Sequence, residues 1–233
     1  MSVIVAIHLE TDLSEFTSTV TDSGDLYWAA AAALAGTAGG MAMLLDDTTA
    51  IYGTKTVATN TSGKLRARFY LDPNSLIMAN LDQFYVLFCR NSTPAEICSV
   101  DLYYATATGY SLVARAKNDA GTSVTQLAFL SDAPHYVEIY LQRAATNISS
   151  DGSLTWWIDG TAKTSITSLD NYDRFPNFVD LWWGAAINVD AGTSGTFYLD
   201  ELVVNDDGGV IGPLYIAKPK RIGNPSILRA SSW

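Results

Sequence analysis

The chain has 233 residues, of which 48% are hydrophobic and only 16% are charged, so it is long enough to bury one large core. Its formal net charge is −10. Nucleic acid is excluded as a partner, because a nucleic-acid binder needs a basic surface that displaces counterions from phosphates. No stretch of about 18 apolar residues is present, so we expect no membrane span.

The first predicted element is a strand over residues 3–9. The apolar run is broken at His8 and Glu10, and no basic residue precedes it, so it does not predict a secretory signal. We therefore expect a protein that is made in the cytoplasm and that reaches a virion, or the extracellular space, only after release.

Short stretches in which apolar and polar residues alternate follow one another along the chain, with Gly, Asn, Asp, Ser and Thr between them. This period of two is typical of strands joined by turns. The predicted strands cover residues 3–9, 26–30, 41–45, 55–57, 64–71, 84–90, 97–104, 111–117, 125–130, 136–142, 154–159, 161–166, 179–183 and 196–204. Parallel pairing would need crossover helices, and none is predicted. We expect an all-β antiparallel β-sandwich over residues 1–212.

Cys89 and Cys98 lie in two predicted strands on either side of a short loop. In a symmetric hairpin their thiols would face each other, and a disulfide would then depend on the geometry of the two side chains. In a reducing compartment the same residues would be two small buried side chains with free thiols. The sequence leaves both interpretations open.

The end of the chain differs in charge from its body. Residues 213–233 contain no acidic residue and four cations, Lys218, Lys220, Arg221 and Arg229. We expect a basic C-terminal arm that docks on the acidic body or on a neighbouring subunit. Exposed ion pairs contribute only about 0–1 kcal/mol each, so apolar side chains such as Trp233 are expected to contribute most of the affinity.

Three segments carry a family resemblance. Residues 152–160, GSLTWWIDG, resemble a hairpin of concanavalin A-like and laminin G-like domains, and residues 195–202, GTFYLDEL, resemble the last strand of those domains. Residues 8–12, HLETD, are similar to their opening segment. The resemblance implies a jelly-roll β-sandwich, of the type found in carbohydrate-binding modules and in bacteriophage virion proteins.

The resemblance also implies a metal site. Jelly-roll carbohydrate-binding modules often hold a structural Ca²⁺ between the opening segment and the last strand. The matching positions are Glu10 and Asp200, with Asp12 as a third candidate. Their carboxylates are the hard oxygen ligands that Ca²⁺ prefers. The alternative is that these side chains are simply solvated.

Successive side chains of a strand point to opposite faces. This parity predicts that Trp156 and Trp183 lie in the core. The outward positions of the same group of strands predict a surface of aromatic rings and a carboxylate, formed by Tyr136, Tyr140, Trp157, Asp180, Trp182 and Tyr198. Such a surface suits a glycan, whose C–H faces stack on rings, or a protein partner. A third interpretation is that a loop or the tail covers the rings.

The sequence contains no motif that indicates catalysis. Glycosidases need two carboxylates, because one protonates the leaving oxygen while the other attacks or assists, and no pair has the spacing that this family carries on one strand. Asp200 and Glu201 are adjacent, so they should face opposite sides unless a bulge intervenes. His8 and His135 have no catalytic motif around them. We therefore expect that the protein is not an enzyme.

Two functions remain open. The first is a non-catalytic structural or adhesive protein of a bacteriophage-like virion, such as a capsid decoration or tail component, whose partners would be copies of itself or a particle scaffold. Scarce charge, the basic arm and the family resemblance support it. The alternative is a carbohydrate-binding module that holds a glycan on its outer aromatic face. Glycoside hydrolase activity is a distant third.

Overall fold

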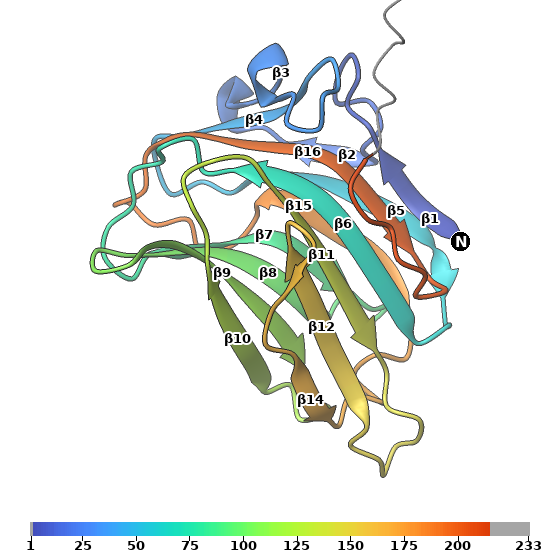
Figure 1. The fold of residues 1–233 in the computed structure, drawn as a ribbon. Helices are drawn as coiled ribbons and strands as arrows, with labels where there is room; N and C mark the ends of the chain where they lie inside the picture. Colours follow the sequence, from blue (N-terminus) through green and yellow to red (C-terminus); the bar gives the residue numbers. More distant parts are fainter. Residues whose placement is uncertain (1, 215–233) are drawn as a thin grey trace, which may run out of the picture.

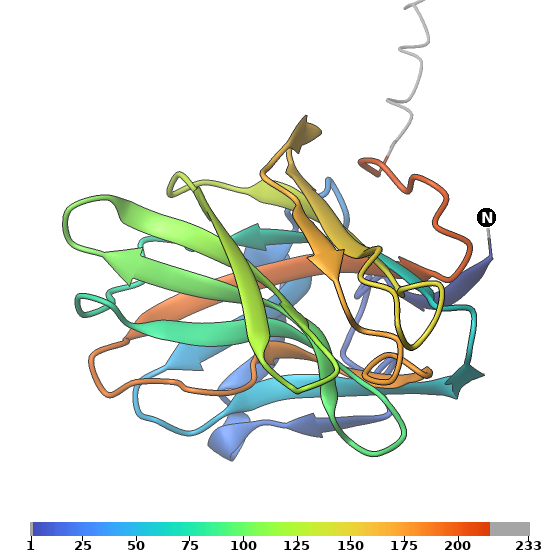
Figure 2. The same cartoon turned by 90° about the horizontal axis from the view of Figure 1, so that it is seen from below.

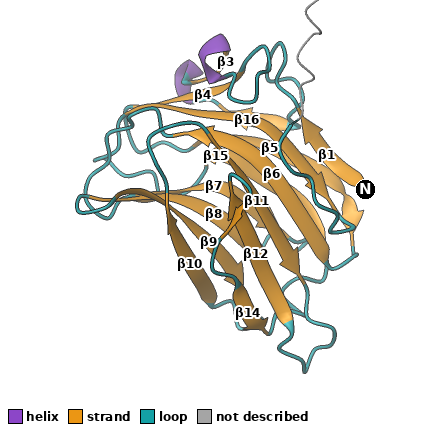
Figure 3. Cartoon of the chain, in the orientation of Figure 1, coloured by secondary structure: helices purple, strands orange, loops and turns teal. Residues whose placement is uncertain are grey.

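The computed structural model describes residues 2–214. Within this part, the chain folds almost entirely into strands, joined by loops and two short turns of 3-10 helix (Figures 1 and 3). The strands form two antiparallel sheets that lie face to face, and Figure 2 shows the two layers from a second direction. The predicted all-β antiparallel sandwich is confirmed.

Sheet A is nine-stranded, with the order β13-β12-β11-β6-β16-β4-β3, and β1 and β14 add to β16 and β12. Its strands are β1 (Val3–Ile7), β3 (Leu26–Ala29), β4 (Gly40–Leu45), β6 (Lys64–Asp72), β11 (His135–Gln142), β12 (Gly152–Ile158), β13 (Thr161–Ala162), β14 (Ile166–Leu169) and β16 (Gly195–Asn205).

Sheet B is seven-stranded, with the order β10-β9-β8-β7-β15-β5-β2. Its strands are β2 (Ser18–Val20), β5 (Ile51–Asn60), β7 (Gln83–Arg90), β8 (Glu96–Ala105), β9 (Gly109–Lys117), β10 (Ser123–Phe129) and β15 (Phe178–Ala185). The 3-10 turns η1 (Asp22–Gly24) and η2 (Ala30–Ala32) flank β3.

The predicted strands differ from the observed ones chiefly at three places, the first of which is β5, where only residues 55–57 of Ile51–Asn60 were predicted. The sequence does not predict β2, a three-residue strand whose side chains are all exposed, so it shows no inward apolar position. The predicted strand over residues 161–166 is divided into β13 and β14. At the break, the indole N–H of Trp156 donates to the carbonyl of Thr164 at 2.8 Å, which takes that carbonyl out of the strand ladder.

The core lies between the inner faces of the two sheets. Trp156 on β12 and Trp183 on β15 have no exposed surface, as the strand parity predicts. The ring of Trp183 in sheet B meets Phe69 of sheet A edge-on, with centroids 6.4 Å apart. Such edge-to-face pairs add to the hydrophobic burial that holds the layers together.

A bulge in β16 changes the parity near its middle. The register shifts between Asp200 and Val203, and Glu201 adopts a positive φ of 54°. Leu199 and Leu202 on either side are fully buried in the core. Asp200 and Glu201 therefore both lie on the outer side of sheet A, which is the exception that the sequence prediction allowed for.

Cys89 and Cys98 are direct partners in the ladder between β7 and β8. Both are buried free thiols. Of the two interpretations, the structure therefore agrees with two small buried side chains and not with a disulfide. A hydrogen bond with Cys98, together with burial, raises the pKa of Cys89. The thiol therefore stays protonated at neutral pH, which makes it a poor nucleophile.

The predicted basic arm, with Lys218, Lys220, Arg221, Arg229 and Trp233, lies outside the described residues. Its docking, and the boundary between a sandwich that ends at residue 212 and an arm that starts at residue 213, stay predictions. Over residues 2–214, no helix has the length and the apolar character that crossing a bilayer requires.

Candidate functional site

The predicted aromatic surface is divided between the two outer faces of the sandwich. Four of its six residues lie on sheet A, namely Tyr136 and Tyr140 on β11, Trp157 on β12 and Tyr198 on β16. The other two, Asp180 and Trp182, lie on β15, which pairs with β5 and β7 in sheet B. The prediction that all six share one side is therefore wrong, because strand parity fixes inside and outside but not the sheet.

On sheet B, the side chains of Trp182 and Asp180 both interact with neighbouring residues of the same sheet. Trp182 stacks on Tyr52, with centroids 4.7 Å apart, and the guanidinium of Arg90 lies 4.2 Å from the centroid of the Trp182 ring. Arg90 also donates two hydrogen bonds of 2.7 Å to Asp180. This bidentate pair and the stacked rings form a closed cluster on the outer face of sheet B.

On sheet A, an ion pair underlies the aromatic rings. Arg66 on β6 donates to the Glu138 carboxylate on β11, and both side chains are almost completely buried although they point away from the core. The Arg66 guanidinium lies 4.6 Å from the ring centroid of Trp157 and 5.6 Å from that of Tyr140. The alternation of residues 65–69 directs Arg66 and Arg68 outward, although neither was among the predicted site residues.

The segment that follows β16 lies over this ion pair. In this C-terminal strap (residues 208–214), the carbonyl of Gly208 accepts a hydrogen bond from Arg66 at 3.2 Å. The backbone N–H groups of Ile211 and Gly212 donate to Glu138 at 2.9 and 3.0 Å. Part of the sheet A surface is therefore covered from within the chain, as the third interpretation of the aromatic residues predicts.

Between the strap and the aromatic rings a cleft of about 280 Å³ remains open. Aromatic rings, the ion pair and the strap form its lining, which consists of Arg66, Tyr136, Glu138, Trp157, Gly160, Val210, Gly212 and Pro213. Burial, with Glu138 nearby, raises the pKa of Tyr136. The Tyr136 hydroxyl therefore stays protonated at neutral pH, and it forms no hydrogen bond within the described part of the chain.

Tyr140 and Tyr198 do not line the cleft. Tyr140 packs against the strap at Gly208, and burial raises its pKa. Tyr198 is further along sheet A, where β16 pairs with β4 and β6 opposite Ala42 and Asp72. Of the four predicted residues on sheet A, only Tyr136 and Trp157 thus meet in the cleft.

The predicted calcium ligands all accept hydrogen bonds from backbone N–H groups. Asp200 Oδ2 accepts hydrogen bonds from Leu34 N at 2.9 Å and Ala35 N at 3.1 Å, while its Oδ1 has no partner among the described residues. Glu10 accepts one from the N–H of Ala38 in the same loop, and Asp12 binds Ser14 N. Burial raises the pKa of Asp200 to about 6. Asp200 and Glu10 thus both hold the loop of residues 34–38, and calcium binding stays a prediction.

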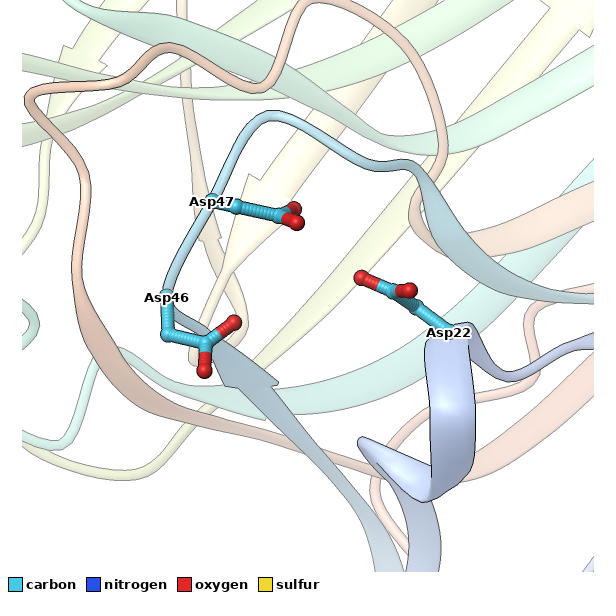
Figure 4. Close-up of side chains that lie close together, drawn as sticks. All are labelled: Asp22, Asp46 and Asp47. Atoms are coloured by element: carbon cyan, nitrogen blue, oxygen red, sulfur yellow. The ribbon is translucent and has the colours of Figure 1, made fainter.

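A different group of carboxylates lies close together in the described structure. Asp22 in η1 faces Asp46 and Asp47, which follow β4, and their ligand atoms lie within 4.8 Å of one another (Figure 4). Asp47 also accepts a hydrogen bond from Thr49 N at 2.6 Å. Such exposed acidic groups are as compatible with solvation as with a cation.

His135 also has partners that the sequence analysis did not identify. Its ring lies between Ser131 and Asp159, two residues that are distant from each other in the sequence. The three belong to the loop before β11, the first residue of β11 and the turn after β12. Asp159 is too far from Ser131 and His135 in the sequence to form a short motif with them. The group can be recognised only once β11 and β12 are known to pair.

No protein-family model matches the chain, and a search of curated proteins finds no match. Solved structures do resemble it. Alginate lyase Aly36B has a TM-score of 0.59 and 11% identity, covering 88% of this chain and 97% of the lyase. An endo-β-1,4-glucuronan lyase from the fungus Trichoderma reesei has a TM-score of 0.58 and 13% identity, covering 85% and 94%.

The receptor binding domain of botulinum neurotoxin type G has a TM-score of 0.52 and 9% identity, and the match covers 89% of this chain and 50% of the toxin chain. At such identities the likeness shows the fold alone, a jelly-roll-like β-sandwich. The concanavalin A-like or laminin G-like type within it stays a prediction.

The comparison corrects the expected function. The alginate lyase and the glucuronan lyase both match over almost their whole length, and both are polysaccharide lyases. The expectation of a non-catalytic bacteriophage-like virion protein is wrong on this finding, and so is the expectation that the chain is not an enzyme. The expectation depended on the missing carboxylate spacing of glycosidases, which a lyase does not need, and on histidines without a motif around them.

Proposed function

We propose that the protein is a carbohydrate-active enzyme that binds a polysaccharide on the outer face of sheet A. The observation that carries the proposal is the cleft between the strap and the rings of Tyr136 and Trp157. Aromatic rings offer flat apolar surfaces to the C–H faces of sugars. The buried Arg66–Glu138 pair holds the strap in place through two hydrogen bonds from the strap backbone to Glu138, and so fixes the wall of the cleft opposite the rings.

Tyr136 is the candidate proton donor of this site. Cleavage of a glycosidic chain, by elimination or by hydrolysis, requires a proton on the leaving oxygen. Tyr136 lines the cleft, and burial raises the pKa of its hydroxyl above the ordinary value of 10.0, so the proton is in place at neutral pH. It forms no hydrogen bond within residues 2–214, so it is available to a bound sugar.

Charge bears on the choice of substrate. The two arginines of this face are each paired with a glutamate, Arg66 with Glu138 and Arg68 with Glu201. The chain as a whole carries a net charge of −10. Long-range repulsion of a polyuronate is screened beyond roughly 8 Å at physiological salt, so both acidic and neutral polysaccharides must be tested. The similar folds act on alginate and glucuronan by name, which puts polyuronates first in the panel.

The test is an assay of chain cleavage on alginate, glucuronan and neutral β-glucans. Unsaturated ends, detected by their ultraviolet absorbance, report elimination, and new reducing ends report either reaction. We expect turnover of at least one polysaccharide, reduced on the order of a hundredfold or more in Tyr136→Phe. Tyr140→Phe is the matched control, because Tyr140 lies on the same strand and face but outside the cleft. No turnover on any substrate, or equal loss in both variants, contradicts the proposal.

A further inference from the structure

We propose that Ser131, His135 and Asp159 form a nucleophilic catalytic group that hydrolyses an acyl ester. The Ser131 Oγ lies 2.7 Å from Nε2 of His135, and the Nδ1 of His135 lies 2.6 Å from Oδ2 of Asp159. A hydroxyl on one ring nitrogen and a carboxylate on the other is the arrangement by which an imidazole activates a serine.

The fold fixes the carboxylate end of this group. Asp159 begins the turn after β12 with a positive φ of 51°, and it exchanges two hydrogen bonds with Tyr136. Its Oδ1 accepts from Tyr136 N at 3.0 Å, and its own N–H donates to the Tyr136 carbonyl at 2.9 Å. The carboxylate thereby holds the proton of His135 on Nδ1 and leaves the lone pair of Nε2 directed at Ser131.

Exposure at this end of the sandwich suits a nucleophile. Ser131 is exposed, whereas the His135 side chain is only 13% exposed. An ester can therefore reach the hydroxyl while the imidazole stays packed in place. The backbone N–H groups of Asp132 and Ala133 form no hydrogen bond with any described residue. As the two residues that directly follow Ser131, they are the backbone donors that we assign to the negative charge that develops on the carbonyl oxygen during attack.

The reaction follows from these contacts. Ser131 Oγ bonds to the carbonyl carbon of the ester while its proton passes to His135 Nε2. The bond from that carbon to the alcohol oxygen then breaks, and His135 returns the proton to the departing alcohol, which leaves an acyl group on Ser131. Water repeats the sequence: His135 takes its proton, the oxygen adds to the acyl carbon, and a carboxylic acid leaves as Ser131 regains its proton. The Asp159 carboxylate stabilises the imidazolium in both halves.

The position of the group indicates which ester it takes. Tyr136 and Gly160 line the cleft on sheet A, and they are the chain neighbours of His135 and Asp159. Because successive side chains alternate along β11, the group lies at the end of the strand beside the cleft and not within it. We assign an acyl group carried by a hydroxyl of the bound polysaccharide, such as an acetyl ester. This assignment of the alcohol rests on the proposed function, but the ester hydrolysis itself does not.

A fluorophosphonate probe tests the nucleophile in the full chain, because it reacts with activated serines and needs no polysaccharide. Mass spectrometry of peptides should place the label on Ser131. The labelling rate should fall on the order of a thousandfold in His135→Gln and vanish in Ser131→Ala. Ser75→Ala is the matched control, since the exposed Ser75 donates to Asp132 at 2.7 Å in the same region but has no histidine beside it. This variant should label as the wild type does.

The possible results separate the two proposals. If Ser131 of the wild-type protein is not labelled, the catalytic group is overturned, whatever the cleft binds. The same holds if the His135→Gln variant is labelled as fast as the wild type. A labelled protein that releases acetate from a nitrophenyl ester but not from an acetylated polysaccharide overturns only the assigned substrate. Acetate release without any chain cleavage supports the catalytic group and contradicts the function proposed for the cleft. Wild-type labelling needs no variant, so misfolding of a variant cannot obscure the outcome.

Discussion

Arg66 and Glu138 form an ion pair that lies on the outer side of sheet A and is nevertheless buried, with side-chain exposures of 7% and 4%. The strap excludes water from the pair, and Glu138 in turn accepts two backbone hydrogen bonds from the strap. The pair therefore connects the sheet, the cleft and the end of the described chain. Removing either charge would leave the other buried without a partner.

Glu138→Gln should lower the free energy of unfolding by about 3–5 kcal/mol, because the uncompensated guanidinium of Arg66 would stay buried. Urea denaturation measures the loss. Glu10→Gln is the control, since Glu10 is exposed and accepts one backbone hydrogen bond of 3.2 Å, and it should cost less than about 1 kcal/mol. Equal losses in the two variants would mean that the strap does not keep the ion pair dry.

Trp156→Ala and Trp157→Ala should differ strongly although the residues are neighbours. Trp156 has no exposed surface, and truncation of a buried Trp typically costs about 3–5 kcal/mol. Trp157 is partly exposed and would lose its contact with Arg66, worth roughly 1 kcal/mol. Denaturation of both variants measures the difference. If Trp157→Ala is the more damaging change, the strand parity on which the site is built is wrong.

Asp200 should make the stability of the fold depend on pH. Burial raises its pKa from 3.8 to about 6 in the folded state. Between these values the unfolded chain has lost the proton while the folded chain still holds it, so stability falls as pH rises from about 4 to about 6. Above pH 6 the contribution is constant. Melting temperatures across this window should show a smaller decline in Asp200→Asn, and an unchanged slope would contradict the assignment.

Gly208→Ala should test the packing of the strap on Tyr140. Gly208 has a positive φ of 77°, and a Cβ there would lie 2.8 Å from the Tyr140 hydroxyl and 2.9 Å from its ring. Gly109→Ala is a matched control, because its φ is 76° and a Cβ would meet nothing within 4 Å. The control should cost about 1 kcal/mol through backbone strain alone. A similar cost at Gly208 would show that the strap is free to move away.

Strand positions and side-chain parity could be predicted from the sequence, because both depend on the local alternation of apolar residues. Trp156 and Trp183 lie inside, and Trp157 and Trp182 outside, as expected. The sheet to which each strand belongs could not be predicted. It depends on long-range pairing, such as that of β15 with β5 and β7, which separates Trp182 from Trp157.

Only part of the candidate site could be predicted from the sequence. The sequence predicted that Tyr136 and Trp157 point outward. It did not predict that residues 210–213 of the strap form the other wall of their cleft. The group around His135 depends on a turn that places Asp159 beside the start of β11. The residues of the cleft and of the His135 group come together only through tertiary contacts. No short sequence motif therefore predicts either one.

Binding to polysaccharides tests the central claim most directly. Trp157 and Trp182 are matched, since each is partly exposed and has an arginine over its ring, at 4.6 and 4.2 Å, on opposite faces of the sandwich. In native gels that contain the polysaccharide, the wild-type protein and Trp182→Ala should be retarded alike, while Trp157→Ala should lose at least about tenfold in affinity, or about 1.4 kcal/mol. Retardation that survives in Trp157→Ala and disappears in Trp182→Ala would place the ligand on sheet B and contradict the account.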